Sequence, residues 1–221
     1  MTSYYAAQAV CSASRAAILT GCYPNRLGIS GAFGPKSKRG INPDEFLLSE
    51  MLKENNYKTG IFGKWHLGDA EKFLPTNHGF DEFYGILFSN DMWKFHPERP
   101  EGYPDDLMLY RNETPIQSII DQSNLTKDIT DESIRFIEEN KDNQFFLYIA
   151  HPQPHVPLFA SKDFNEFAFV VSVPSSNSRY LPVPRFESYT CQAYAEFLDL
   201  PHTQSGWKPT PVIAFVPLLP E

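Results

Sequence analysis

The sequence is poor in cysteine, in basic residues and in long apolar runs, and each shortage argues against a class of protein. Three cysteines among 221 residues, with no CxxC pair, predict neither a disulfide framework nor a zinc site. With 19 Lys and Arg against 27 Asp and Glu, the net charge of -8 argues against nucleic acid as a partner, because phosphates bind basic surfaces. No run of about 18 apolar residues is present, which predicts no membrane span. Residues 1–10 also lack the charged region and the apolar stretch of a signal peptide.

Apolar residues occur in an order that predicts an α/β fold. A helical pattern at 47–52 precedes a short strand at 57–62, and a second helix, beginning near Thr126, precedes the buried run FFLYIA at 145–150. Helix followed by buried strand, repeated, is typical of a largely parallel sheet with helices on both faces. Ligands of such sheets bind beyond the carboxyl ends of the strands. Two loops that contain histidine, GKWHLG and HPQPHVP, follow the strands at that edge.

Two segments depart from this order. Residues 78–122 are rich in Pro, Asn, Asp and aromatic residues, and we expect them to form an irregular insertion over the sheet. From about residue 165 prolines recur and no apolar period persists. We therefore divide the chain into an α/β domain at 1–164 and an irregular, Pro-rich tail at 165–221.

The segment CSASRAAILTG, residues 11–21, is the most specific feature of the sequence. It predicts a helix that is capped by Ser12 or Ser14. Arg15 follows Cys11 by about one helical turn, so the two side chains project on the same side. Taken alone, the cysteine is more typical of a small buried hydrophobe, and the arginine of a solvated or paired residue at a helix start.

The loop GKWHLG, residues 63–68, places two polar side chains at the end of a strand. Lys64 and His66 are two residues apart, so an extended backbone directs both to one side. In the loop HPQPHVP, His151 follows the strand directly and His155 precedes Val-Pro. None of these residues is informative alone, because exposed lysine is common and histidine is often a core residue.

Together, and with NHGFDEFYG at 77–85, the three motifs resemble those of the formylglycine-dependent sulfatases, especially the arylsulfatases and N-acetylgalactosamine-6-sulfatases. The resemblance covers about residues 3–164 and makes residues 1–164 a partial catalytic domain. The usual family core is Cys-x-Pro-Ser-Arg; Ala13 replaces the proline here, as in a Cys-x-Ala-x-Arg form of the family. The resemblance implies an alkaline-phosphatase-like fold with a mixed, largely parallel sheet, truncated at both ends, and hydrolysis of aryl or carbohydrate sulfate monoesters.

The resemblance also implies a role for each motif residue. Cys11 is oxidised to formylglycine by a formylglycine-generating or an anaerobic sulfatase-maturating enzyme, and the hydrated aldehyde attacks sulfur. Arg15 anchors the resulting diol, and Lys64 binds both the diol and the sulfate. His66 lies beside the diol and helps to deprotonate it.

Two histidines compete for the role of general acid toward the leaving oxygen. His155, in its Val-Pro context, fits the family position, and an imidazole suits the task because its pKa can be placed near neutrality. His151 is the competing candidate, which either lines the sulfate pocket or caps the strand. Both histidines, like Lys64, are therefore candidate substrate-binding residues.

Calcium is the remaining cofactor that the resemblance implies. The family binds it through two adjacent Asp at the end of the first strand and through a later Asp-Asn pair, since a hard cation needs several oxygen ligands. Asp105-Asp106 lies in a Gly-Pro loop without a preceding buried strand, so we do not expect it to bind metal. Of the family's ligands only the matured Cys11 is present, and the remaining ones are absent from the chain. The resemblance thus predicts an incomplete calcium site.

Two alternatives stay open beside a sulfatase that acts on a sulfated small molecule or glycan. A phosphonate or phosphodiester hydrolase of the same superfamily would use the same diol and cations. The second alternative is that the chain is a catalytically inactive sulfatase fragment, because it would lack the electrostatic catalysis that a divalent ion provides.

Overall fold

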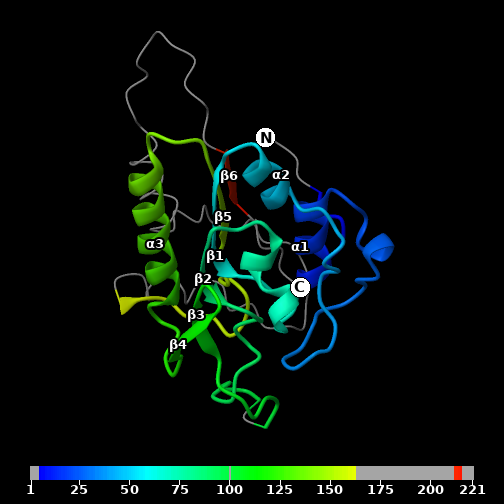
Figure 1. Cartoon of the computed structure of the whole chain (residues 1–221). Helices are drawn as coiled ribbons and strands as arrows, with labels where there is room; N and C mark the ends of the chain where they lie inside the picture. Colours follow the sequence, from blue (N-terminus) through cyan, green and yellow to red (C-terminus); the bar gives the residue numbers. More distant parts are fainter. Residues whose placement is uncertain (1–4, 100, 163–211, 216–221) are drawn as a thin grey trace.

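The fold is built on one six-stranded sheet with helices against both faces (Figure 1). The computed structural model of the chain describes residues 5–99, 101–162 and 212–215. In chain order, its elements are α1 (Cys11–Thr20), η1 (Pro24–Leu27), α2 (Leu48–Glu54), β1 (Lys58–Lys64), η2 (Glu71–Phe73), η3 (Pro75–His78), β2 (Glu82–Ile86), β3 (Met108–Arg111), β4 (Thr114–Ser118), α3 (Leu125–Asn140), β5 (Phe145–Ala150) and β6 (Val212–Phe215). No helix in these residues is long and apolar enough to cross a bilayer.

The strands follow the order β4-β3-β2-β1-β5-β6, with a parallel centre and an antiparallel edge. Strand β1 pairs in parallel with both β2 and β5, and β6 pairs in parallel with β5. Strands β3 and β4 continue the sheet beyond β2 as antiparallel neighbours. The predicted α/β class, with a mixed and largely parallel sheet, is confirmed.

The expected irregular insertion at 78–122 is wrong, because this segment supplies β2, β3 and β4. These strands have only four or five residues each, too few for a clear period of two. Strand β4, TPIQS, is exposed along nearly its whole length and therefore carries no apolar pattern. Within the proposed tail at 165–221, residues 212–215 form β6; the rest of the tail lies outside the described residues.

The sheet separates two apolar cores, which explains why FFLYIA is apolar without interruption. All six residues of β5 are buried. Phe146, Tyr148 and Ala150 belong to the core under α1 and α2, whereas their neighbours Phe145 and Leu147 belong to the core under α3. Figure 1 shows α3 on one side of the sheet and α1 and α2 on the other. A strand covered on both faces needs apolar residues at every position.

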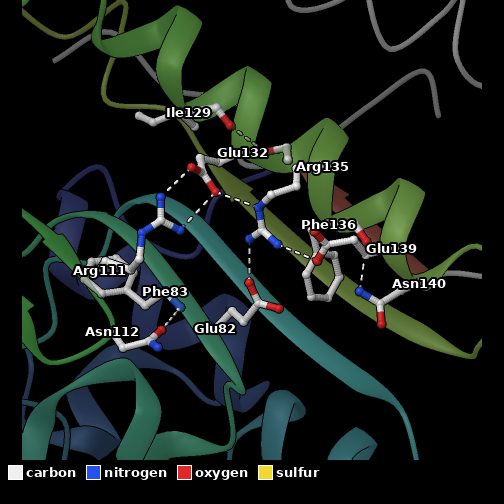
Figure 2. A network of polar contacts seen from close by, with 11 residues as sticks. Glu82, Phe83, Arg111, Asn112, Ile129, Glu132, Arg135, Phe136, Glu139 and Asn140 are labelled. Atoms are coloured by element: carbon white, nitrogen blue, oxygen red, sulfur yellow. Dashed lines mark hydrogen bonds and ion pairs between the residues drawn. The ribbon is translucent and has the colours of Figure 1, made fainter.

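A network of charged side chains joins α3 to the sheet (Figure 2). Arg135 on α3 lies 2.5 Å from Glu82 of β2, and it also pairs with Glu132 and Glu139 of its own helix. Arg111, at the end of β3, contacts the same Glu132 through both terminal nitrogens. Because Arg135 is about one third exposed, each pair contributes little, and the network mainly fixes the register of α3 over β2 and β3.

Gly63 determines how closely β1 and β5 approach at the end that carries Lys64. Its φ of 122° lies outside the range of other residues, and a Cβ atom there would lie 2.1 Å from the carbonyl oxygen of Ala150. Only glycine therefore permits this strand end.

We expect Gly63→Ala to lower the free energy of unfolding by roughly 2–4 kcal/mol, because it adds both backbone strain and a steric clash. Urea unfolding followed by circular dichroism measures the change. Gly31→Ala is the matched control: a Cβ atom there has no neighbour within 4 Å, so its effect is expected within about 0.5 kcal/mol. Equal stabilities for the two variants would contradict the assignment.

Candidate active site

Helix α1 places Cys11 in its first turn. The N-cap is Val10, which has an extended backbone and accepts a hydrogen bond from the Ser14 N–H at 2.8 Å. The predicted capping by Ser12 or Ser14 is therefore wrong. The Ser12 hydroxyl instead accepts the N–H of Phe33 at 3.1 Å, which holds the following loop against the helix. The partial positive charge of the helix N-terminus consequently acts directly at Cys11.

Arg15 is buried beside the end of β1 and is 1% exposed. Its Nη1 donates to the backbone carbonyl of Lys64 at 2.5 Å. Its Nη2 has no hydrogen-bond partner among the described residues. Burial of a guanidinium N–H without an acceptor is costly, so this group is suited to an anion that enters the site.

Lys64 is the last residue of β1 and is fully buried. Its Nζ donates to the hydroxyl of Ser89 at 2.8 Å. The sequence analysis missed Ser89, which follows the neighbouring parallel strand β2. A signal was available, since a polar Ser-Asn-Asp run ends the buried segment 83–87 at the same edge of the sheet.

His66 is fully buried and held in a single orientation. Its Nε2 lies 2.8 Å from the carbonyl oxygen of Phe33. A carbonyl only accepts, so Nε2 carries the proton and Nδ1 of the neutral ring is the basic nitrogen. Burial, followed by the charge of Lys64, lowers the pKa of His66 well below 6.5, and Arg15 adds to this effect. His66 is therefore neutral at pH 7.

His155 lies in contact with Cys11, and the two share a hydrogen bond that raises the pKa of His155. Burial and the charge of Lys64 oppose this rise. The Nδ1 of His155 lies 2.6 Å from the carbonyl oxygen of Val156. An imidazole whose pKa is raised keeps its proton to a higher pH and is suited to donate it.

Asn90, which the sequence analysis also missed, connects the loop after β2 to the loop that carries His155. Its Nδ2 donates to the carbonyl oxygens of His155 and Pro157 at 3.3 and 3.2 Å. Its own carbonyl accepts Nε2 of Gln122 at 2.9 Å. Asn90 is fully buried, so these bonds fix the position of the His155 backbone.

The structure brings Cys11, Arg15, Lys64, His66 and His155 together, since Arg15, Lys64 and His155 all affect the pKa of His66 and His155 contacts Cys11. His151 differs from them. Burial alone lowers its pKa to about 4, and within the described part of the chain neither ring nitrogen has a hydrogen-bond partner. Of the two competing histidines, His155 is the one that contacts Cys11.

The described residues do not fit a calcium ion. They contain no group of three His, Cys, Asp or Glu side chains placed to hold a metal. Asp105 pairs with Lys36 at 2.8 Å, and Asp106 pairs with Lys94. Both carboxylates are thus engaged with lysines.

Fold and site together define an α/β protein with buried cations and imidazoles around a cysteine at a helix N-terminus. The Sulfatase family model matches residues 1–200, and the chain belongs to the sulfatase family of sulfuric ester hydrolases. It is 39% identical to an arylsulfatase of Hemicentrotus pulcherrimus over 177 residues, 74% of this chain and 32% of the relative. It is also 39% identical to the N-acetylgalactosamine-6-sulfatase of Homo sapiens over 176 residues, 73% of this chain and 34% of the relative.

A solved structure supports the same fold. The crystal structure of Ps i-CgsB in complex with k-i-k-neocarrahexaose aligns with a TM-score of 0.61 and 30% identity, covering 77% of this chain and 40% of that one. The alkaline-phosphatase-like fold is therefore confirmed. The chain spans about a third of the length of the curated relatives given above.

His151 is partly exposed, but both of its ring nitrogens are buried, and its lowered pKa makes stability depend on pH. Its pKa is about 4 in the fold against 6.5 in the unfolded chain, so below pH 6.5 the unfolded chain takes up a proton that the fold does not. We expect this residue to remove about 3 kcal/mol from the free energy of unfolding between pH 6.5 and 4. Urea titrations at several pH values measure the loss.

In His151→Gln the free energy of unfolding should fall less between pH 6.5 and 4, since glutamine does not titrate. His155→Gln, in the same loop, is the control: the pKa of His155 is raised, so its contribution is complete below 6.5 and lost on the alkaline side. An unchanged acid slope in His151→Gln would contradict the assignment.

Proposed function

We propose that the protein hydrolyses sulfate monoesters, aryl or carbohydrate, with a nucleophile made from Cys11. One observation carries this proposal: the guanidinium of Arg15 and the ammonium of Lys64 are both buried beside Cys11, at the N-terminus of α1. Buried cations and a helix N-terminus favour an oxygen-rich anion. A sulfate group that enters this site would compensate the charge of both side chains.

The proposed nucleophile is formylglycine, which supplies a hydrated aldehyde whose second hydroxyl allows the sulfate to be expelled after the attack. The surroundings of Cys11 fit such a group, because Cys11 is partly accessible and already exchanges a hydrogen bond with His155. We infer that a formylglycine-generating or an anaerobic sulfatase-maturating enzyme makes the conversion.

The chain's own residues then divide the remaining tasks. Arg15 and Lys64 hold the sulfate oxygens, and Ser89 orients the Lys64 ammonium. The Nδ1 of neutral His66 accepts a proton, since its Nε2 is held by Phe33. His155 donates a proton to the leaving oxygen. Calcium remains an implication of the family, and no step is assigned to it.

The relatives support a sulfated aryl compound or glycan as substrate, since they include an arylsulfatase, an N-acetylgalactosamine-6-sulfatase and a structure with a bound neocarrahexaose. A catalytically inactive sulfatase fragment is the second candidate. It is favoured by the lack of a metal-binding cluster in residues 5–99, 101–162 and 212–215. Chelator-sensitive hydrolysis by the 221-residue chain would exclude this candidate.

Cys11→Ala is expected to reduce hydrolysis of p-nitrophenyl sulfate by at least about a thousandfold, because no covalent intermediate can form. Cys22→Ala is the matched control, a partly accessible thiol just after the same helix, and it should retain activity. Intact mass of the Cys11 peptide shows whether the thiol has become an aldehyde. Undiminished hydrolysis by Cys11→Ala would overturn the proposal, and a much higher kcat/KM for an aryl phosphodiester would replace it with a diesterase.

Asn90→Ala tests whether the backbone bonds of Asn90 position His155 as the acid. Displacement of His155 should lower kcat about tenfold for an alkyl sulfate, whose leaving group needs a proton, and much less for p-nitrophenyl sulfate. Parallel kinetics on the two substrates measure the difference. An equal loss on both would indicate a general structural defect instead.

A further inference from the structure

A cavity of about 490 Å³ lies beside the proposed sulfate site, and its size is typical of small-ligand pockets, about 300–1,000 Å³. Its walls come from the loop after α1, the loop after β1, the segment that follows β2 and the approach to β3. The residues that matter for recognition are Lys36, Asp69, Phe88, Met92, Asp105 and Tyr110.

Three segments of the chain connect this cavity to the site. Phe33, whose carbonyl holds His66, lies three residues before Lys36 in the cavity wall. Asp69 lies three residues after His66 itself. The ring of Phe88 lies 6.3 Å from the imidazole of His66, and Phe88 directly precedes the serine that binds the Lys64 ammonium. Phe88 therefore belongs both to the cavity wall and to the surroundings of His66, so the cavity adjoins the proposed site.

The lining combines hydrogen-bond acceptors with apolar surface. Asp69 accepts the backbone N–H of Lys36 at 2.8 Å, and Asp105 lies 2.8 Å from the Lys36 ammonium. These contacts fix the carboxylates, whose oxygens can each accept more than one hydrogen bond. Phe88 and Tyr110 supply aromatic surface. A sugar ring offers the complementary groups, with hydroxyl donors on its edge and C–H groups on its face.

The charge of the lining distinguishes between sugars. Three carboxylates line the cavity, those of Asp69, Asp105 and Asp106. Lys36 pairs with Asp105 and Lys94 pairs with Asp106, so these groups together keep an excess of one negative charge. A second sulfate or a carboxylate on the ligand would be repelled by this excess negative charge, and salt would weaken the repulsion because the charged side chains are partly exposed. A neutral hydroxyl-bearing unit meets no such cost.

We propose that this cavity binds a neutral sugar unit that adjoins the sulfated position of the substrate, and that it selects against a second anionic group there. The proposal rests on the proposed sulfatase function for its biological meaning. Binding of the neutral sugar, however, does not require turnover, so the two can fail separately.

Methionine methyl groups provide a direct test of binding. Met92 and Met108 line the cavity, whereas Met51 lies on α2 and does not. In the 221-residue chain labelled with ¹³C-methyl methionine, lactose should shift the Met92 and Met108 signals in a saturable way and leave Met51 unchanged. Met92→Leu and Met108→Leu assign the signals. Shifts at none of the methyl groups, or equal shifts at Met51, would overturn the proposal.

Asp105→Asn keeps the shape of the side chain and weakens its acceptor strength, so the lactose Kd should rise roughly tenfold. Asp131→Asn is a matched control, because Asp131 is a similarly exposed carboxylate paired with Lys127 on α3. Equal affinities in Asp105→Asn and Asp131→Asn would count against the assigned cavity.

Kinetics separate this proposal from the function itself. Lactose carrying one sulfate on the galactose should have a lower KM than lactose carrying sulfates on both sugars. Asp105→Lys should reduce or reverse that preference, whereas Asp131→Lys on α3, outside the cavity, should retain it. No hydrolysis of any sulfate, together with lactose binding, would refute the sulfatase function alone; hydrolysis with no preference in the wild type would refute the selection alone.

Discussion

The site depends on one hydrogen bond between distant parts of the chain, from Nη1 of Arg15 to the backbone carbonyl of Lys64. It joins residues 49 positions apart and is fully buried, so helix α1 and the end of β1 must come together before it forms. Nη2 of the same guanidinium has no hydrogen-bond partner among the described residues. The bond to Lys64 thereby sets the geometry between the proposed nucleophile and the cations that face it.

Helix α1 packs into the core on its side of the sheet through small side chains. Ala13 and Ala16 are fully buried in the core, and Leu19 completes the same face one turn later. The family's usual proline at position 13 would lie in the first helical turn, where a backbone N–H has no helical acceptor in any case. Alanine therefore preserves the helix start and the packing, and the departure from the usual motif leaves the position of Cys11 unchanged.

Sequence reasoning succeeded where a signal is local. The apolar run FFLYIA predicted a strand, and the helical spacing of apolar residues within 125–140 predicted a helix. The structure confirms both, because in each element the regular spacing of apolar residues matches the side that is buried. It failed for β3 and β4, because these strands form by pairing with neighbouring strands and are too short to show an alternation of apolar and polar residues. The same limitation hid Ser89 and Asn90. Each matters through a partner 25 or more residues away, Lys64 for the first and the His155 loop for the second. The polar Ser-Asn-Asp run marks the edge of the sheet, but it does not indicate which distant residue each side chain contacts.

The electrostatics of the two site imidazoles support their proposed division of roles. Both rings experience the charge of Lys64, which lowers the pKa of each. Burial lowers the pKa of His66 further, so this ring is a neutral base, whereas the hydrogen bond with Cys11 raises the pKa of His155. Groups of one kind whose pKa values are moved apart by their surroundings can serve as base and acid at the same pH. The rise at His155 originates mainly in its hydrogen bond with Cys11, so a chemical change of that side chain alters the proton affinity of the acid that acts beside it.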